Sequence, residues 1–447
     1  MKSTFLLGLL VSALSLANAL PPEVASLIPA SIDIRNSQYA YAKKEINQLI
    51  KSCGVGVFQG IQAEGARNKC SFQVALDDLF FLPPWKKTGL LHEKDWAHKD
   101  GVVWIQPKPI DVPVNFDLRD YMTGGIPEIK KQNCGDCWAW STHHGLEISR
   151  AVHDGKTYDH SVQTVLSCSN KGSCGGGYMS AVGFLTHGLP YEEDFTYKGN
   201  NARCKYSSAD IEQGWDAKII AAPYIGSSKD YSRAKMKKDG SFRVTSLSEM
   251  AQAMVEWKAP LVVTVDAYSI SGAGVYDRCS SINSGGNHMV AIVGWEMWNG
   301  KLVAHVWNSW GKSHGEDGVS RIVWDCGNGK LNHGLGVSAR VVQYKAECQT
   351  PYPAQKAKHN VSEVDGGVEI GFVQEKGTTC SWLPQEGLEN PNSCLTRANP
   401  KVSTEYHLTA SNECGTASSM TLVQVPGPAK NSGKKTIQTV FGKIKER

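Results

Sequence analysis

Two cysteines separated by two residues lie where this chain's chemistry is easiest to propose. Cys134 and Cys137 belong to the stretch QNCGDCWAWSTHHGLE, residues 132–147. This spacing suits a redox pair, half of a zinc site, a structural disulfide, or a nucleophile beside a bridged cysteine. The preceding residues PEIKKQ are too polar for the buried strand that comes before a redox pair. Cys168 and Cys174 are six positions apart, which is poor spacing for zinc. Both features favour a structural thiol or a nucleophile.

The first residues of the chain indicate export. Residues 1–19 contain a lysine, an apolar run from Phe5 to Leu16 and the small-x-small sequence ANA, which together predict a signal peptide. The run is too short for a membrane span, and no later stretch reaches about 18 uninterrupted apolar residues. Leu20 stands where a lipoprotein would have cysteine. We therefore expect a soluble secreted protein, extracellular or periplasmic.

Because the protein is expected to be exported, the number of its cysteines is informative. The chain has 13, and in an oxidising compartment most of them should pair. An odd number leaves at least one thiol unpaired if every disulfide lies within the chain, which favours a thiol kept for chemistry. The net charge of +4 is too small to indicate a nucleic-acid or membrane partner. We expect no cofactor and no bound metal.

The residues after 113 form the longest globular stretch, and they must position any reactive groups. The pattern predicts a helix over Cys137–Val152 and strands over 261–265, 289–293 and 303–307. Helical segments come first and strands second. This order predicts an α+β domain of two layers with a cleft between them.

Four blocks, of which the stretch above contains the first, make the sequence resemble the papain-like cysteine peptidases of the papain family. In the family's order they are Gln132 with Cys134–Ser141, then Cys174–Tyr178, then Gly286–Gly294, then Asn308–Gly311 followed by Gly315–Gly318. Residues 114–120 also look like the family's mature amino terminus. The resemblance implies a papain-like two-subdomain fold, with a helical half, a β-barrel-like half and an active-site cleft between them.

The resemblance also implies a role for each matching residue. Cys137 would be the nucleophile, because a helix amino terminus and a nearby imidazolium both favour a thiolate. His288 would supply that imidazolium and Asn308 would orient its ring, with Trp310 shielding their hydrogen bond. Gln132 and the Cys137 backbone N–H would form the oxyanion hole. Losing one such donor typically costs roughly 3–4 kcal/mol.

The sequence departs from the family's pattern in three places. Asp136 stands where Ser or Ala is usual, and it would either raise the pKa of the thiol or point to solvent. Gln132 is one residue closer to the nucleophile than usual. His288 follows Cys137 by 151 residues and Asn308 follows it by 171, against a family guide of about 130–150. We expect the excess to lie in a longer connection at 295–301. Other histidines, His143, His144 and His314, are expected at the surface or on helices.

The resemblance further implies disulfides and a substrate cleft. The implied pairs are Cys134–Cys174 and Cys168–Cys204, with Cys279–Cys326 and Cys53–Cys70 as further pairs. The pairing of the four tail cysteines, Cys348, Cys380, Cys394 and Cys414, stays open. Gly176 and Gly177 would hydrogen-bond an extended peptide, as in strand addition. The lining of the main pocket would be Tyr178, Met179, Thr264, Met289 and Ser338, which suits a hydrophobic side chain.

Composition divides the chain into further units. Residues 20–112 form an amino-terminal unit ending in a proline-rich linker, and they are either a propeptide or an accessory unit. Residues 113–345 are the expected peptidase domain. Residues 346–427 alternate short strands and turns, which predicts a small all-β sandwich resembling immunoglobulin-like modules. Residues 428–447 form a basic tail. The β module could bind a surface or a glycan, or merely space domains.

The expected function is therefore a secreted cysteine endopeptidase made as a zymogen, acting on protein or peptide substrates. The absence of a histidine-rich occluding loop modestly favours an endopeptidase over an exopeptidase. The main alternative is a catalytically inactive papain-like binding protein. The intact set of Cys137, His288, Asn308 and Gln132 argues against it, because decay would break such a set. A transglutaminase-type enzyme would use aspartate where this chain has Asn308.

Overall fold

The computed structural model describes residues 20–426, apart from gaps at 34–36, 62–64, 79, 94–95, 229–245, 268–271, 281–285, 345–350, 352, 362–365, 375–376 and 414. The predicted signal peptide and the basic tail lie outside the described residues, as do Cys348 and Cys414. In the described part of the chain, no helix has both the length and the apolar character to cross a bilayer.

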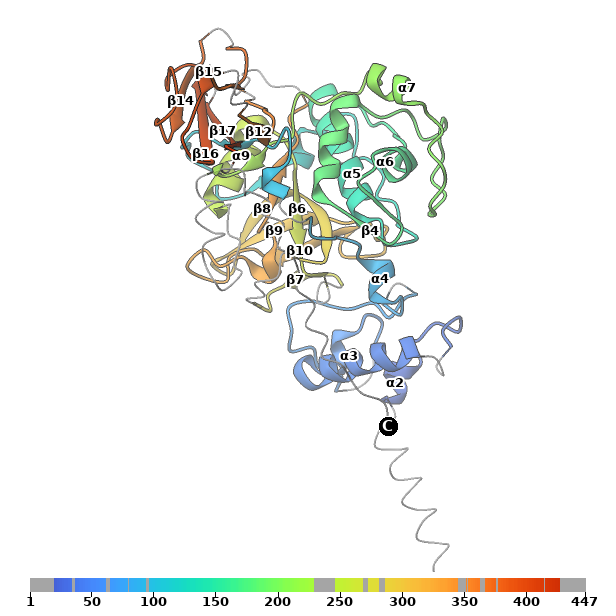
Figure 1. The fold of residues 1–447 in the computed structure, drawn as a ribbon. Helices are drawn as coiled ribbons and strands as arrows, with labels where there is room; N and C mark the ends of the chain where they lie inside the picture. The colour runs from blue at the N-terminus through green and yellow to red at the C-terminus, as the bar shows by residue number, and fades with distance from the viewer. Residues whose placement is uncertain are drawn as a thin grey trace, which may run out of the picture.

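The amino-terminal unit is mainly helical. Its helices α2 and α3 lie at one end of the molecule, and the last strands of the chain lie at the other (Figure 1). Its elements are α2 (Pro22–Ala25), α3 (Ser37–Cys53), the 3-10 helices η1 (Val55–Val57) and η2 (Trp96–His98), α4 (Pro84–Lys87) and strand β1 (Trp104–Gln106). The Cys53–Cys70 disulfide joins the end of α3 to the loop that follows.

The helical half of the central region is built around one long buried helix. This helix, α5 (Cys137–Asp154), ends at Gly155, whose φ of 61° is the left-handed conformation that commonly ends helices. Around it lie α6 (Val162–Cys168), β3 (Gly172–Ser173), β4 (Gly176–Gly177), η4 (Met179–His187) and α7 (Ser208–Gln213). Nearly every residue of α5 is buried, which agrees with its central place.

The β half follows in the sequence and lies against α5 (Figure 1). Its main strands are antiparallel neighbours in the order β11 (Ala339–Val341), β6 (Leu261–Val265), β8 (His288–Trp298), β9 (Lys301–Trp307) and β10 (Val319–Val323). Strand β6 is buried along its whole length, as its continuous apolar sequence requires. The half also contains β2 (Phe116–Asp117), η3 (Leu118–Tyr121), β5 (Tyr224–Ile225), α9 (Leu247–Trp257), β7 (Val275–Tyr276) and η6 (Asn332–Gly334).

The connection expected at 295–301 is not a loop. Strand β8 continues to Trp298, and β9 begins at Lys301, so only Asn299 and Gly300 form the turn. Both have positive φ, 47° and 73°, which is the geometry of a tight hairpin turn. The expectation was wrong because residues 295–298 and 301–304 pair as strands.

The carboxy-terminal module contains two small groups of strands. Strands β14 (Thr379–Leu383), β16 (Thr404–Asn412), β17 (Gly415–Gln424) and β12 (Lys358–Asn360) pair with one another, while β13 (Val368–Gly371) pairs with β15 (Leu395–Ala398). The Cys380–Cys394 disulfide joins the two groups. Trp382 is fully buried beside it, and the Tyr406 hydroxyl donates to the Glu386 carbonyl at 2.6 Å.

The amino-terminal unit is less separate than its sequence indicates. Its strand β1 pairs with β17 of the module on one side and with β5 of the central region on the other. The sheets of the module and of the central region thereby become continuous.

Candidate active site

The thiol of Cys137 lies at the first residue of α5, where the helix leaves a turn. Asp136 is the residue before the helix, and Cys137 is completely buried and unpaired. Its position places the thiol near unpaired backbone N–H groups of the first helical turn, where a negative charge is favoured. The backbone N–H of Met289, at the start of β8, also points to this thiol.

His288 is the first residue of β8, immediately before Met289. Its Nε2 lies 2.9 Å from Oδ1 of Asn308, just after β9. Its ring stacks on Trp310 with centroids 4.8 Å apart. Its Nδ1 is buried and has no hydrogen-bond partner among the described residues. The Asn308 bond therefore fixes the ring and leaves Nδ1 as the nitrogen available for proton transfer.

Burial keeps both reactive groups neutral in this state. It raises the pKa of the Cys137 thiol far above its usual range, although the Met289 N–H opposes the change. Burial also lowers the pKa of His288 to about 4, against the effect of the bond to Asn308. A thiolate–imidazolium pair requires a more open cleft than this one.

A segment of the amino-terminal unit hydrogen-bonds to the residues around Cys137 and His288. The backbone N–H of Gly177 donates to Gly89 at 2.7 Å, and Leu91 N–H donates to Gly177 at 2.8 Å. Leu90 N–H donates to the carbonyl of Asn287, the residue before His288, at 3.0 Å. Residues 89–91 therefore pair with Gly177 as an added strand, in the place expected for substrate.

The side chain of Gln132 also makes hydrogen bonds, one of them to the amino-terminal unit. Its side-chain amide donates to the carbonyl of Lys86 at 3.1 Å and of Cys134 at 2.8 Å, while its oxygen accepts from the Ser309 hydroxyl. The next residue, Lys87, accepts a hydrogen bond from the Trp310 indole at 3.0 Å. We call residues 86–91 the covering segment. Both amide protons of Gln132 are thus taken, and one becomes free for another oxygen when the segment leaves.

The structure brings most of the expected pocket residues together. The Ser338 hydroxyl lies 3.1 Å from the Met179 sulfur, and Ser338 N–H contacts the Thr264 hydroxyl at 3.3 Å. Thr264 is also the register partner of Met289 across β6 and β8. Leu90 of the covering segment is buried in the same apolar cluster as Met179 and Met289. Gly176 lies in β4, and Tyr178 directly precedes η4.

The side chain of Asp136 does not point to solvent. It is completely buried, and its Oδ2 accepts a hydrogen bond from the Tyr197 hydroxyl at 2.7 Å. Its Oδ1 is buried with no partner among the described residues. Burial raises the pKa of this carboxyl to about 7, against the effect of the Tyr197 bond. Sequence reasoning missed Tyr197, because nothing in its surroundings connects it to residue 136.

This carboxyl gives a prediction about pH and stability. The pKa of Asp136 is raised on folding, so the folded protein holds this proton more tightly than the unfolded chain between pH 4 and 7. Stability is therefore lost as pH rises through that window. Replacing Asp136 with asparagine should remove the loss, so the variant gains up to about 3 kcal/mol more relative to the parent at pH 8 than at pH 4.5.

Urea unfolding at the two pH values checks this, in a Cys137→Ala background that prevents self-cleavage. Asp210→Asn is the matched control, because Asp210 is exposed and hydrogen bonds from Ser207 lower its pKa. Its effect should be equal at both pH values. An equal Asp136→Asn effect at both pH values would show that the buried carboxyl does not titrate in this window.

Of the three histidines expected at the surface or on helices, two lie on a helix as expected and one differs. His143 and His144 lie on α5 as expected, but both are buried, and His144 contacts Trp307. His314 is buried as well, and its ring meets Trp310 edge-on at 4.6 Å. Both His288 and His314 therefore contact the Trp310 indole.

Two disulfides lie in the helical half around Cys137, and a third lies in the β half. The structure contains Cys134–Cys174, Cys168–Cys204 and Cys279–Cys326. Cys134–Cys174 joins the turn before Cys137 to the turn before β4. Cys137 is the free cysteine of the described part of the chain.

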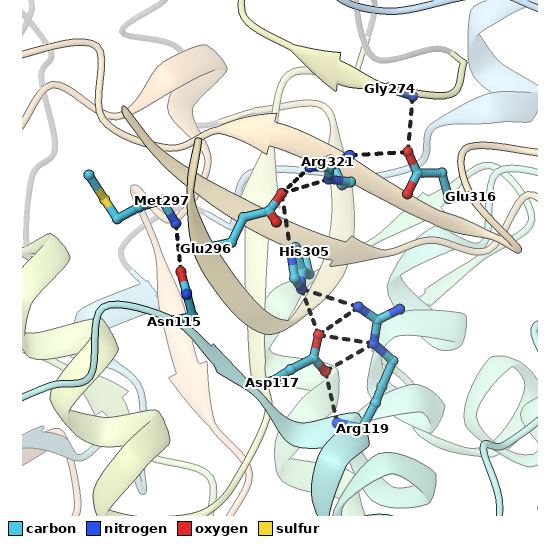
Figure 2. A network of polar contacts seen from close by, with 9 residues as sticks. All are labelled: Asn115, Asp117, Arg119, Gly274, Glu296, Met297, His305, Glu316 and Arg321. Atoms are coloured by element: carbon cyan, nitrogen blue, oxygen red, sulfur yellow. Dashed lines mark hydrogen bonds and ion pairs between the residues drawn. The ribbon is translucent and has the colours of Figure 1, made fainter. Parts of the chain in front are cut away.

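A polar network anchors the expected start of the peptidase domain (Figure 2). Asp117 forms a charged pair with Arg119 at 2.6 Å and contacts His305 Nδ1 at 2.7 Å. Although burial opposes the change, the hydrogen bonds from His305 and Arg119 lower the pKa of Asp117. The network continues through Glu296 to Arg321 and Glu316, and Asn115 accepts from the Met297 N–H. The segment after the proline-rich linker is thereby fixed to β8, β9 and β10.

Comparison with known proteins gives a consistent result. The model of the family described as "Papain family cysteine protease" matches residues 112–340. Cathepsin O of Homo sapiens is 30% identical over 222 residues, covering 48% of this chain and 62% of the human protein, which is less than two thirds of its length. Cathepsin O of Mus musculus is 30% identical over 237 residues, covering 51% of this chain and 68% of the mouse protein.

Solved structures agree on the fold. Digestive procathepsin L 3 of Tenebrio molitor larval midgut superposes with a TM-score of 0.51 at 20% identity, covering 70% of this chain and 94% of that one. A recombinant stem bromelain precursor gives a TM-score of 0.50 at 21% identity, covering 70% and 95%. At such identities the likeness concerns the fold alone.

Proposed function

Because the chain belongs to the papain family of cysteine proteases, we propose that it is a cysteine endopeptidase made as an inactive precursor. The observation that carries this proposal is a buried free thiol at the start of α5, beside the backbone N–H of Met289. Met289 directly follows His288, whose ring is held by Asn308. Residues 86–91 of the amino-terminal unit hydrogen-bond to the residues around these groups. We further propose that the precursor is exported, as its first 19 residues predict.

The reaction proposed for the open cleft proceeds through Cys137 and His288. The imidazole takes the thiol proton at Nδ1, and the thiolate attacks the peptide carbonyl carbon. Gln132 and the backbone N–H of Cys137 stabilise the oxyanion of the tetrahedral intermediate. The imidazolium then protonates the leaving amine, which departs and leaves an acyl-enzyme thioester. His288 next activates a water, which releases the acid product and the thiol.

The geometry of the closed cleft supports these assignments. Asn308 holds Nε2, so Nδ1 is the nitrogen left for proton exchange. The amide of Gln132 already holds a carbonyl oxygen, that of Lys86, which stands in for the oxygen of a substrate. Gly177 already pairs with an extended segment, and Leu90 is buried in the same apolar cluster as Met179 and Met289. We propose a hydrophobic preference at the position two residues before the cut.

The flanking units receive roles under the same proposal. Residues 20–112 contain the inhibitory segment, and residues 113–345 are the peptidase domain. The module at 346–427 is proposed to be immunoglobulin-like, because a buried tryptophan lies beside a disulfide between two groups of strands. Its Tyr406 bond to an upstream carbonyl is a further feature of such modules. A surface or glycan ligand of this module is a proposal on composition alone.

The rival function is an inactive binding protein that keeps the fold to hold peptides. Mass spectrometry separates the two. The purified precursor is treated at acid pH and then incubated with an epoxide that alkylates activated thiolates. We expect shortening at the amino terminus and one adduct, on Cys137. An unmodified Cys137 in a chain whose cleft has been opened would favour the binding protein.

A matched control makes this result specific. Untreated precursor, incubated with the same epoxide, should react at least about tenfold more slowly, because burial disfavours the thiolate. Equal rates before and after acid treatment would contradict the proposed inhibitory role of residues 86–91.

A further inference from the structure

The strand β1 lies between two parts of the molecule that, among the described residues, share no other strand pairing. Trp104, Ile105 and Gln106 pair antiparallel with residues 416–418 of β17. On the other side, β1 pairs parallel with β5, where the N–H groups of Tyr224 and Gly226 donate to the carbonyls of Val103 and Ile105 at 2.8 and 2.9 Å. The carboxy-terminal module therefore meets the peptidase sheet through a strand of the amino-terminal unit.

The side chains of this segment are as buried as those of a domain core. Val103, Trp104 and Ile105 are each at most 1% exposed. Trp96 packs on Tyr224 with ring centroids 4.4 Å apart. By contrast, Leu91 at the end of the covering segment is 43% exposed.

Polar contacts fix the same segment to the module. His98 Nε2 lies 2.9 Å from a carboxylate oxygen of Glu405, whose other oxygen contacts His407. Hydrogen bonds from His407 and His98 lower the pKa of Glu405 to about 2, so the carboxylate stays charged. Asp100 accepts the N–H of Ala357 at 2.9 Å, just before β12.

We propose that residues 96–106 remain bound to the enzyme after the inhibitory segment is removed, as a strand that joins the module to the peptidase domain. The proposal rests on the proposed function, because it presupposes that residues 86–91 leave the cleft. The amino-terminal unit then has two roles: its earlier part inhibits, and its last part is a permanent component of the mature protein.

The alternative is complete removal of residues 20–112, and its physical consequence is large. Loss of β1 would leave the edges of β5 and β17 unpaired and would empty the space that Trp104 fills. Direct contacts between the module and the peptidase domain would still include those of Ser228 with Ser418 and His407. These contacts involve short polar side chains and would not replace a buried strand.

The linker after β1 shows how the strand could also remain without a covalent link. Residues 111–115 are exposed and lie outside regular secondary structure. A cut there, together with a cut before Trp96, would leave residues 96–106 as a separate peptide. A single cut before Trp96 would leave them at the amino terminus of the mature chain. In either product the strand stays between β5 and β17.

The test uses acid-processed, active enzyme purified by size exclusion under native conditions. Its denatured components are then identified by mass spectrometry. We expect residues 96–106 in a one-to-one ratio with the peptidase domain, either covalently attached or as a co-eluting peptide. Active enzyme that begins near residue 112, with its module intact and no such peptide, would overturn the proposal.

Amide hydrogen exchange gives a second, independent readout. In the mature enzyme the N–H groups of Tyr224 and Gly226 should stay at least about 100-fold protected, because their acceptors are carbonyls of the retained segment. The N–H of Gln343, which donates to Ala221, is the control and should be protected in either case. Fast exchange at 224 and 226 with a protected 343 would overturn the proposal while leaving the peptidase function intact.

An inactive product separates the two failures. If processed protein holds residues 96–106 but Cys137 reacts with no epoxide, the proposed function fails and the strand assignment stands.

Discussion

Replacing Cys137 with serine is expected to lower kcat/KM for peptide hydrolysis by about four orders of magnitude or more. The reason is that the reaction needs a nucleophile ionised near neutral pH, and a hydroxyl in the same place has a far higher pKa than a thiol. The substitution changes one atom at a buried position, so the fold should be retained. The measurement is the hydrolysis of a fluorogenic peptide by acid-processed enzyme, with the variant precursor processed by added parent enzyme.

Binding experiments serve as the control for this variant. The Cys137→Ser protein should still bind a slowly cleaved peptide within about threefold of the parent, because Gly177 and the apolar pocket are unchanged. Its urea midpoint should also match. Residual hydrolysis within tenfold of the parent would mean that another group is the nucleophile. Loss of binding together with activity would point to misfolding instead.

Replacing Gly89 with alanine is expected to activate the uncleaved precursor. A Cβ at this position would lie 2.0 Å from the carbonyl oxygen of Gly135 and 2.4 Å from its carbon, both backbone atoms of the turn before the nucleophile. Neither can move without shifting Cys134 or Cys137, so the covering segment must leave its place. Overpacking of this kind costs about 1–3 kcal/mol, which corresponds to an increase of roughly 5- to 150-fold in the open state.

The rate of Cys137 alkylation in intact precursor at neutral pH measures this opening. Gly175→Ala is the matched control, since a Cβ there meets only the Ser173 hydroxyl at 3.4 Å, an ordinary contact. It should leave the alkylation rate unchanged. An unchanged rate in the Gly89→Ala protein, with the chain intact on a gel, would show that residues 89–91 do not control access to the thiol.

Much of the site could be predicted from the sequence because its parts are short and local. A helix beginning at Cys137 follows from the Gly-Asp turn and the helix-tolerant residues after it. The β6 and β9 strands were predicted to within two residues by their continuous apolar runs. The family resemblance, which the comparisons confirm, rests on motifs in a fixed order along the chain, and Cys137, His288 and Asn308 each lie in one of them.

Other features could not be predicted, because they depend on contacts between segments distant in the chain. The burial of Asp136 depends on Tyr197, 61 residues later. Gly89 and Leu90 contact Gly177 and Asn287, which lie so far along the sequence that no local pattern predicts the contact. The sequence indicated a separate unit over 20–112, whereas β1 is part of the shared sheet.

The sequence by itself determined the local elements, the reactive residue types and the family, since each is encoded by neighbouring residues or by motifs in a fixed order. Tertiary structure alone decided that the thiol and the imidazole are covered and neutral, because their pKa values depend on what excludes water from them. It also decided that one strand of the amino-terminal unit joins the other two parts. Strand pairing at a sheet edge uses backbone groups, which every residue except proline carries alike, so the sequence holds little record of the partner.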